Sequence, residues 1–319
     1  MPWTHSEKAF AALPRTLPEA SPAGADELLG HSVLAHSADT LTTTPSTALR
    51  HLDHAAPRPV PVPPVPTRDI LGIPIAMIDY EGAMDAMDAM VASRTRGYVC
   101  AVAVHAVMVA QHDAEMRSAL MGSSLTVPDG MPLVWAANML GENLPNRVYG
   151  PELMKRYTAR CAERGHRVWL YGGRDQGSLA QLALNMRQEN PGIQIVGGYS
   201  PPFRPLTTAE EDALVKRINR ERPDVLWVGI GVPKQEKWMA RMRERVDVPV
   251  MAAVGAAFDF HAGRISQAPP WMQERGLEWT YRIAQEPRRL LPRYLYYNPT
   301  FLMQLGLQVA RERLRPKTS

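Results

Sequence analysis

The sequence predicts a doubly wound α/β fold with a Rossmann-like, mostly parallel sheet, and three observations support this prediction. Apolar, β-branched runs alternate with helical segments, which is typical of strand–helix–strand units in a parallel sheet. Most of these runs end in glycine, and ligands bind beyond the carboxyl ends of such strands. Residues 265–319 are rich in arginine and aromatic residues, which predicts a basic helical appendage after the sheet.

The N-terminal part of the chain differs from the rest in composition. Residues 1–56 are rich in Ala, Ser, Thr and Pro, and residues 57–66 hold six prolines in ten positions. Such a segment favours an extended polyproline spacer. We therefore expect a disordered extension and linker over residues 1–66, an α/β domain over residues 67–264 and the appendage over residues 265–319.

The folded part is expected to begin near Ile70, and its first half holds three strands. A helical stretch is expected between the second strand and about Leu120. The predicted strands cover residues 70–78, 98–104 and 124–128, and the other predicted helices cover residues 81–94, 131–140 and 151–164.

The second half is more regular. Its predicted strands cover residues 167–173, 193–199, 224–231 and 248–256, and its predicted helices lie near residues 176–189, 207–221 and 234–245. Glycine at a strand end allows a ligand to approach the backbone closely. The glycines that we expect beside a ligand here are Gly172, Gly173, Gly229 and Gly231.

The bulk composition narrows the class of protein. The only cysteines, Cys100 and Cys161, are far apart and outside any metal-binding spacing, which indicates a reducing cytoplasm rather than a disulfide scaffold. The nine histidines show no pair at ligand spacing, so we expect no bound metal. No apolar run approaches the length of a membrane span, so a soluble protein is expected.

The net charge of +4 is unevenly distributed. Residues 275–319 hold nine Lys or Arg against three acidic residues, a net charge of +6, so the remainder of the chain carries −2. A basic tail on a slightly acidic body indicates an anionic partner, either a phosphate-bearing ligand or an anionic lipid surface. Nucleic acid is not expected, because the body shows no basic face and no recognised binding motif.

Asp129 is the first candidate catalytic residue. It directly follows the short strand at residues 124–128 and precedes Gly130 at the start of a helix. A carboxylate at the carboxyl end of a strand faces the expected cleft and could act as a general base. A helix cap or a turn is the structural alternative for an aspartate at this position.

Two further segments could contact a ligand. Arg147 precedes a Gly-Pro turn into a helix, where it could pair with Asp129 or hold an anion; taken alone, it could also be a plain surface arginine. In GIGVPKQEKW, Pro233 is suited to the first turn of a helix whose free N–H groups favour an anion or a hydroxylated ligand. Gln235 can both donate and accept hydrogen bonds, as sugar recognition requires.

Several common sites are missing from the sequence. Neither a GxGxxG fingerprint nor a GxxxxGK[ST] loop is found, which disfavours a dinucleotide site and a P-loop. The chain also has no Asp-x-Asp pair and no serine or cysteine nucleophile motif.

The motifs together resemble the WecG/TagA/CpsF family of bacterial glycosyltransferases. The resemblance covers about residues 70–300 in the order of the family. The matching segments are VPDGMPLVW, NRVYGPELM, VWLYGG, DVLWVGIGVPKQEKW and VGAAFDFHAG…APPWMQERGLEWTYRIAQEPRRLLPRYL.

This resemblance implies an inverting, metal-independent hexosyltransferase of exopolysaccharide or other cell-surface polymer synthesis. It would move an N-acetylmannosamine-type sugar, its uronic acid or another hexose from a UDP-sugar to a polyprenyl-diphosphate-linked sugar. Asp129 matches the proposed base, Arg147 and Gln235 match substrate-pocket positions, and Arg282 and Arg289 match arginines thought to close over the donor diphosphate. The enzyme would be cytoplasmic and peripherally attached to the inner face of the plasma membrane, with the appendage as lid and membrane contact.

Four positions depart from the family pattern. Ala101 and Ala103 stand where the family has a Thr-x-Asn motif, and Gln267 and Pro292 stand where arginines are common. These departures indicate altered donor or acceptor choice, and the alternative is a catalytically impaired UDP-sugar-binding or scaffold protein on the same fold. The sequence leaves open whether the chain forms a homo-oligomer.

Overall fold

The computed structural model describes residues 65–269, 271–272 and 275–314. Residues 1–64 of the predicted extension and linker lie outside this range, so the prediction for them stays a prediction.

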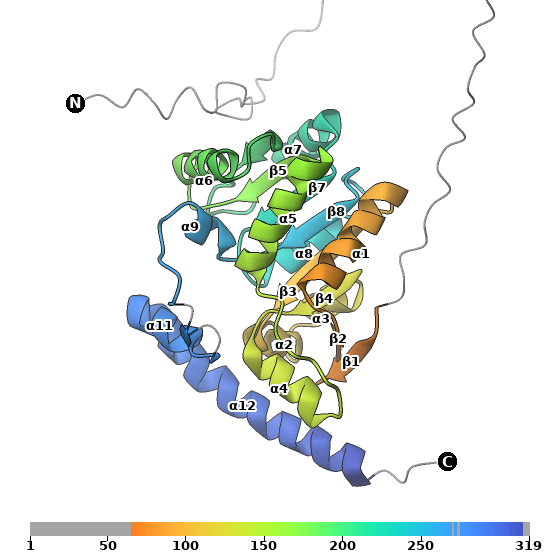
Figure 1. The fold of residues 1–319 in the computed structure, drawn as a ribbon, viewed down its shortest axis with the longest axis vertical. Coiled ribbons are helices and arrows are strands. Elements are labelled where there is room, and N and C mark those ends of the chain that lie inside the picture. The colour runs from red at the N-terminus through yellow and green to blue at the C-terminus, as the bar shows by residue number, and fades with distance from the viewer. Residues whose placement is uncertain (1–64, 270, 273–274, 315–319) are drawn as a thin grey trace, which may run out of the picture.

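A six-stranded parallel sheet forms the centre of the body (Figure 1). All of its neighbouring strands pair in parallel, in the order β4–β3–β8–β7–β5–β6. The strands are β3 (Gly97–Val102), β4 (Leu125–Pro128), β5 (Arg167–Gly172), β6 (Gln194–Tyr199), β7 (Val225–Gly229) and β8 (Val250–Ala253). This arrangement confirms the predicted Rossmann-like α/β class.

Helices cover both faces of the sheet, because the strands alternate apolar side chains between two cores. Cys100 and Val102 of β3 lie in a core with residues of α2, α3, α7 and α8, whereas Val99 lies in a core with residues of α1, α5 and α6. The helices of the body are α1 (Tyr80–Ser93), α2 (Val104–Ala110), α3 (Ala114–Met121), α4 (Met131–Met139), α5 (Gly150–Arg164), α6 (Gln176–Glu189), α7 (Thr208–Glu221), α8 (Lys234–Met242) and α9 (Ala257–His261).

Local capping residues explain where several helices begin. Asp79, Asp113 and Asp175 each accept a hydrogen bond from a backbone N–H in the first turn of α1, α3 and α6. At α7, Thr207 and Glu210 form a reciprocal capping box. The cap at Asp113 also explains why the helical stretch predicted to Leu120 is divided into α2 and α3.

The prediction of a single strand over residues 70–78 is wrong. The segment is the second half of a hairpin, in which β1 (Thr67–Ile70) pairs antiparallel with β2 (Ile73–Ala76). Leu71 and Gly72 turn the chain with φ values of +52° and +79°. A left-handed conformation at two successive residues matches the twist of a two-residue hairpin loop, and the apolar residues on both sides hide this turn in the sequence.

Two helices, α11 (Glu278–Gln285) and α12 (Pro287–Leu314), follow the body. Figure 1 shows α12 running across the end of the body opposite α6 and α7. Phe301, Leu305 and Val309 of α12 are buried in the same core as α2, and the helix continues through Pro292 and Pro299. Among the described residues, no helix is both long and apolar enough to span a membrane.

Candidate functional site

A cavity of about 280 Å³ lies at the carboxyl ends of β3, β4, β7 and β8. The strand order reverses here, since β4 lies on one side of β3 while the later strands lie on the other. Ligands of open α/β sheets bind at such a switch point. From the body it is lined by Ala101, Ala103, Asp129, Gly130, Gly231 and Gln235 among others, and from α11 and α12 by Glu278, Trp279, Arg282, Leu290, Arg293 and Tyr294.

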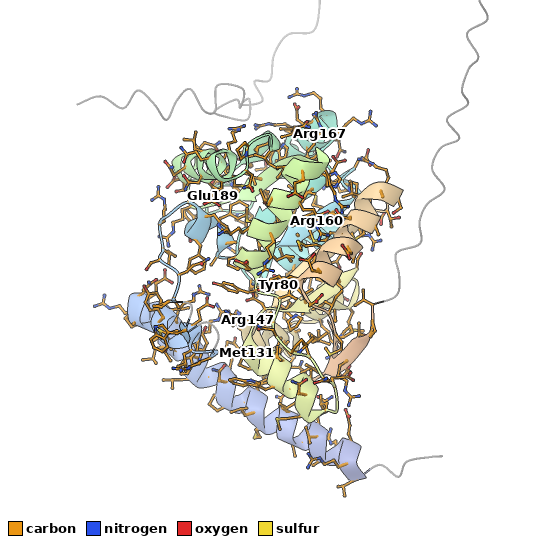
Figure 2. All side chains as sticks on the ribbon, in the orientation of Figure 1. Tyr80, Met131, Arg147, Arg160, Arg167 and Glu189 are labelled. Atoms are coloured by element: carbon orange, nitrogen blue, oxygen red, sulfur yellow. The ribbon has the colours of Figure 1, made fainter. Side chains whose placement is uncertain are left out.

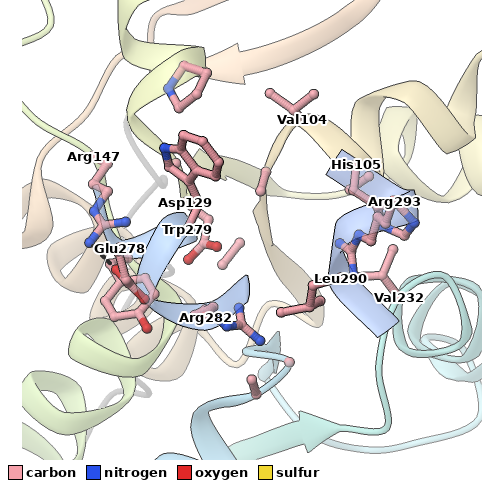
Figure 3. Close-up of a pocket in the computed structure, with 18 of the residues that line it drawn as sticks. Val104, His105, Asp129, Arg147, Val232, Glu278, Trp279, Arg282, Leu290 and Arg293 are labelled. Atoms are coloured by element: carbon pink, nitrogen blue, oxygen red, sulfur yellow. Dashed lines mark hydrogen bonds and ion pairs between the residues drawn. The ribbon is translucent and has the colours of Figure 1, made fainter. Parts of the chain in front are cut away.

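Asp129 lies in the middle of this cavity (Figure 3). Its backbone N–H donates to the Val102 carbonyl oxygen at 2.7 Å, which extends the pairing of β4 with β3. Its Oδ1 accepts a hydrogen bond from the Gly150 N–H at 2.5 Å, at the start of α5. A Cβ at residue 150 would lie 3.3 Å from this Oδ1, so glycine leaves room for the close approach. The carboxylate is therefore fixed by a strand and a helix terminus together.

The surroundings of Asp129 raise the pKa of its carboxyl group. Burial is the main cause, and the negative charge of Glu278 acts in the same direction. The Gly150 N–H, Arg147 and Arg282 lower the pKa but do not outweigh burial. A carboxyl with a raised pKa is a better proton acceptor than a solvated one, so the site suits general base chemistry.

Arg147 pairs with Glu278 of α11, and not with Asp129 as one sequence interpretation allowed. The Arg147 Nη2 lies 2.5 Å from the Glu278 Oε2, and the two side chains are 11% and 6% exposed. The guanidinium also lies 4.3 Å from the centre of the Tyr149 ring. Burial opposes the charged form of Arg147, but Glu278 and Asp129 outweigh it and raise the pKa. Figure 2 shows Arg147 on the side of the body that faces α11, far from Arg167 and Glu189.

Gln235 lies at the start of α8 and is only 1% exposed. Its Oε1 accepts a hydrogen bond from the Gly231 N–H at 3.2 Å, and its Nε2 donates to the Glu236 Oε1 at 2.9 Å. Both Gly231 and Gln235 line the cavity, as the sequence predicts for residues that contact a ligand.

Arg282 projects from α11 toward the cavity (Figure 3). Its guanidinium lies 5.7 Å from the centre of the Phe260 ring. Within the described part of the chain, no carboxylate forms an ion pair with it. Arg282 is therefore well placed to meet an anion. The side chain of Arg289, predicted for the same task, lies outside the described part of the structure.

Four of the predicted binding residues do not line the cavity: Gly172, Gly173, Gly229 and Pro233. Packing accounts for two of these glycines. A Cβ at Gly172 would lie 2.4 Å from the Gly229 carbonyl oxygen, and one at Gly229 would lie 2.3 Å from the Phe258 ring. Their part in ligand binding stays a prediction.

Several residues of the cavity were missed by the sequence interpretation, chiefly Glu278, Arg293, Tyr149 and His105. Glu278 and Arg282 are four residues apart in a helix, and this spacing could have placed both on one face. Burial and the charge of Arg293 lower the pKa of His105 to about 3, so its ring is neutral at physiological pH. The same ring packs edge-on against Tyr297 at 4.9 Å.

The remaining sequence predictions concern polar groups and metals. Ala101 and Ala103 line the cavity with methyl groups, and Gln267 is exposed away from it. Over the residues that the structure describes, no group of three or more His, Cys, Asp or Glu side chains could hold a metal ion.

Comparison with known proteins identifies one family of glycosyltransferases. The sequence model of the glycosyl transferase WecG/TagA/CpsF family matches residues 68–318. A relative from Bacillus subtilis (strain 168) is 28% identical over 177 residues, which are 56% of this chain and 67% of the relative. A relative from Staphylococcus aureus (strain MRSA252) is 31% identical over 180 residues, 54% of this chain and 68% of the relative. Both relatives are named N-acetylglucosaminyldiphosphoundecaprenol N-acetyl-beta-D-mannosaminyltransferase.

Proposed function

The chain belongs to the WecG/TagA/CpsF family of glycosyltransferases, and we propose that it moves a sugar from a UDP-sugar to a lipid-diphosphate-linked sugar. Its relatives are named for transfer of an N-acetylmannosaminyl group to N-acetylglucosaminyldiphosphoundecaprenol. The donor proposed here is correspondingly an N-acetylmannosamine-type sugar, its uronic acid or another hexose, and the product enters a cell-surface polymer.

The position of Asp129 carries this proposal. A base at the centre of the cavity takes the proton of an acceptor hydroxyl, whose oxygen forms a bond to the anomeric carbon of the donor. The bond from that carbon to the diphosphate oxygen breaks on the opposite face, and its electron pair leaves with UDP. Because one displacement occurs, the configuration at the anomeric carbon is inverted.

The leaving diphosphate needs positive charge, and Arg282 is the first residue proposed to supply it. Arg147 is neutralised in part by Glu278, whereas Arg282 has no carboxylate partner among the described residues. Arg293 lines the cavity as well. A forked guanidinium binds phosphate oxygens in two places, so these arginines support transfer without a metal.

Replacing Asp129 with asparagine tests the base. The side-chain oxygen of the asparagine could still accept the Gly150 N–H bond, so the fold should be kept, while transfer should fall by about 10²–10⁴-fold. Transfer would be measured with a panel of UDP-sugars and a short-chain lipid-diphosphate acceptor. Asp175→Asn is the matched control, because Asp175 caps α6 outside the cavity and asparagine caps equally well. Near-wild-type transfer by the Asp129→Asn variant would remove this residue from the base role.

Metal independence is tested separately in the wild-type enzyme. Transfer should be unchanged after dialysis against EDTA and should not rise when Mg²⁺ or Mn²⁺ is added. A loss in EDTA that Mg²⁺ or Mn²⁺ restores would show that a cation, not the arginines alone, neutralises the diphosphate.

We also propose that α12 contacts an anionic membrane surface, where a lipid-linked acceptor would be found. Its outward face exposes large apolar side chains, and the sequence between Arg293 and Arg311 has no charged residue. Apolar residues flanked by arginines are typical of helices that lie in a membrane interface. The exposed residues are Leu291, Leu295, Tyr296, Leu302, Met303 and Leu307.

Sedimentation with vesicles that contain phosphatidylglycerol tests this contact. Leu295→Asp with Leu302→Asp should reduce the bound fraction severalfold, because each change places a carboxylate on the apolar face. Phe203→Asp is the control, since Phe203 is 87% exposed but lies outside α11 and α12. Equal binding by both variants would contradict a membrane contact through α12.

A further inference from the structure

Glu236 is a buried carboxyl group that the proposed reaction does not use. Its side chain is 0% exposed and does not line the cavity, and no described residue forms a hydrogen bond with its Oε2. Burying a carboxylate is costly unless hydrogen bonds or a counter-charge compensate. Because this burial is costly and the neighbouring side chain of Gln235 lines the cavity, we looked for a role of Glu236 in positioning that side chain.

The neighbour that Glu236 contacts is Gln235. The Gln235 Nε2 donates to the Glu236 Oε1 at 2.9 Å, while the Gln235 Oε1 accepts the Gly231 N–H at 3.2 Å. The Nε2 atom also lies beneath Gly255, where a Cβ would be 3.8 Å from it. Gly231, Gln235 and Gly255 all line the cavity.

These contacts select one orientation of the carboxamide. If the amide were flipped, its NH₂ group would face the Gly231 N–H, and its oxygen would face the oxygen of Glu236. Two donors would then oppose each other at one end, and two acceptors at the other. Glu236 therefore holds the Gln235 nitrogen toward α8 and the oxygen toward the Gly231 loop.

A carboxamide can donate two hydrogen bonds and accept two. One N–H is used by Glu236 and one lone pair by Gly231, so one donor and one acceptor are left at the wall of the cavity. A paired donor and acceptor fit the hydroxyl and carbonyl groups of a sugar or a nucleobase.

We propose that Glu236 is a positioning residue, whose carboxyl group fixes the Gln235 carboxamide so that its remaining donor and acceptor face the donor substrate. This inference rests on the proposed function and adds to it a residue outside the cavity. Burial raises the pKa of Glu236 to about 7, against the opposing effects of Gln235, its own backbone N–H and Arg293. The buried thiol of Cys100 on β3 is a further titratable neighbour, and burial and the charge of Glu236 raise its pKa.

Two substitutions separate the acceptor from the charge. Glu236→Gln removes the charge but keeps an oxygen that can accept the Gln235 N–H, whereas Glu236→Met removes both at similar volume. Met239→Leu is the control, since Met239 is a fully buried residue of the same helix outside the cavity. Thermal unfolding would confirm that all three variants fold.

Titration with UDP and transfer kinetics are the functional measurements. Glu236→Met should raise the Kd for UDP or the KM for the donor about tenfold with kcat within about threefold, the size expected for one misplaced hydrogen-bonding group. Glu236→Gln and Met239→Leu should stay within about twofold of the wild type. If Glu236→Met binds and reacts like the wild type, or if Glu236→Gln loses as much as Glu236→Met, the positioning role is wrong.

A measurement without ligand tests the role of Glu236 independently of the proposed function. The Gln235 side-chain NH₂ should give a slowly exchanging signal in a ¹⁵N-correlated NMR spectrum of the wild type and of Glu236→Gln. Glu236→Met should lose that protection, and unchanged protection would contradict the proposal. Failure of the wild type to bind UDP would overturn the proposed function instead, and the amide signal would still test Glu236.

Discussion

The body and the two C-terminal helices bring residues to the same cavity but hold them in different ways. Asp129 is fixed by backbone contacts, from Val102 of β3 and from Gly150 of α5. Glu278 and Arg282 belong to α11, which meets the body at the cavity through the side-chain pair of Arg147 with Glu278. The sheet thus determines the place of the proposed base, whereas Arg282, the arginine proposed for the leaving group, depends on the docking of α11.

Because of this difference, we expect that substitutions can alter transfer without altering the fold. A change in α11 should alter transfer while the sheet stays intact, because its six strands are paired among themselves. Substitutions in α11 and in the body therefore measure this separation.

Of the substitutions in α11, Arg282→Ala should have the larger effect, a loss of about 10²-fold in kcat/KM. The reason is that a preorganised positive group stabilises charge that develops in the transition state. Arg288→Ala is the matched control, because Arg288 is an exposed residue near the start of α12 that does not line the cavity. Steady-state kinetics of both variants would decide the question, and a twofold effect or less at Arg282 would refute its role.

Glu278→Gln should have a smaller effect, a loss of about tenfold in kcat/KM. Removing one partner of a buried ion pair leaves the other charge uncompensated, which commonly costs about 3–5 kcal/mol. We expect that cost to appear as weaker docking of α11, seen as faster hydrogen exchange in residues 278–291, with the strands of the sheet unchanged.

Glu312→Gln is the control for the Glu278→Gln variant. Glu312 lies in α12 and pairs with Arg68 of the body, as Glu278 of α11 pairs with Arg147, but the pair of Glu312 is partly exposed. Exposed pairs contribute little, so its transfer should be close to wild type. If exchange in the strands rises together with exchange in α11, the two regions do not separate as described.

Glu236→Gln should have the smallest effect on transfer and a clear effect on stability. The pKa of Glu236 in the folded protein, about 7, is above the ordinary value of 4.5, so the unfolded chain ionises first. The free energy of unfolding of the wild type should therefore fall as the pH rises from 4.5, the ordinary pKa of the group, to about 7, its pKa in the folded protein.

Urea unfolding at pH 5 and pH 8 would measure this effect. Glutamine carries no such penalty, so the variant should gain on the wild type by about 1–3 kcal/mol between these two pH values. The same gain in Asp175→Asn, at an exposed helix cap, would show that it does not come from the buried carboxyl group of the body.

Much of the fold followed from local patterns. The parallel strands and their helices were predicted because most of the strands are apolar enough to be buried on both faces, and because caps such as Asp175 are local signals. The hairpin at residues 67–76 was missed because Leu71 adopts a left-handed conformation, which is not expected of leucine.

The candidate site was predicted only in part. Asp129, Arg147, Gln235 and Arg282 were chosen from strand ends, a helix start and the family resemblance, and all four line the cavity. Glu278 was missed because its partner is 131 residues away in the chain. No local pattern predicts that Glu278, a residue type that is usually exposed, is buried against Arg147 of another segment.

Periodicity and short motifs are properties of neighbouring residues, so the sequence was enough to predict the α/β class, the family and the position of Asp129 at a strand end. Which charged side chains meet at the cavity is seen only in the folded chain. It pairs Arg147 with Glu278, leaves Arg282 facing the cavity, and places Glu236 behind Gln235. Burial depends on contacts between distant segments, and the pair of Arg147 with Glu278 forms only when α11 packs against the body.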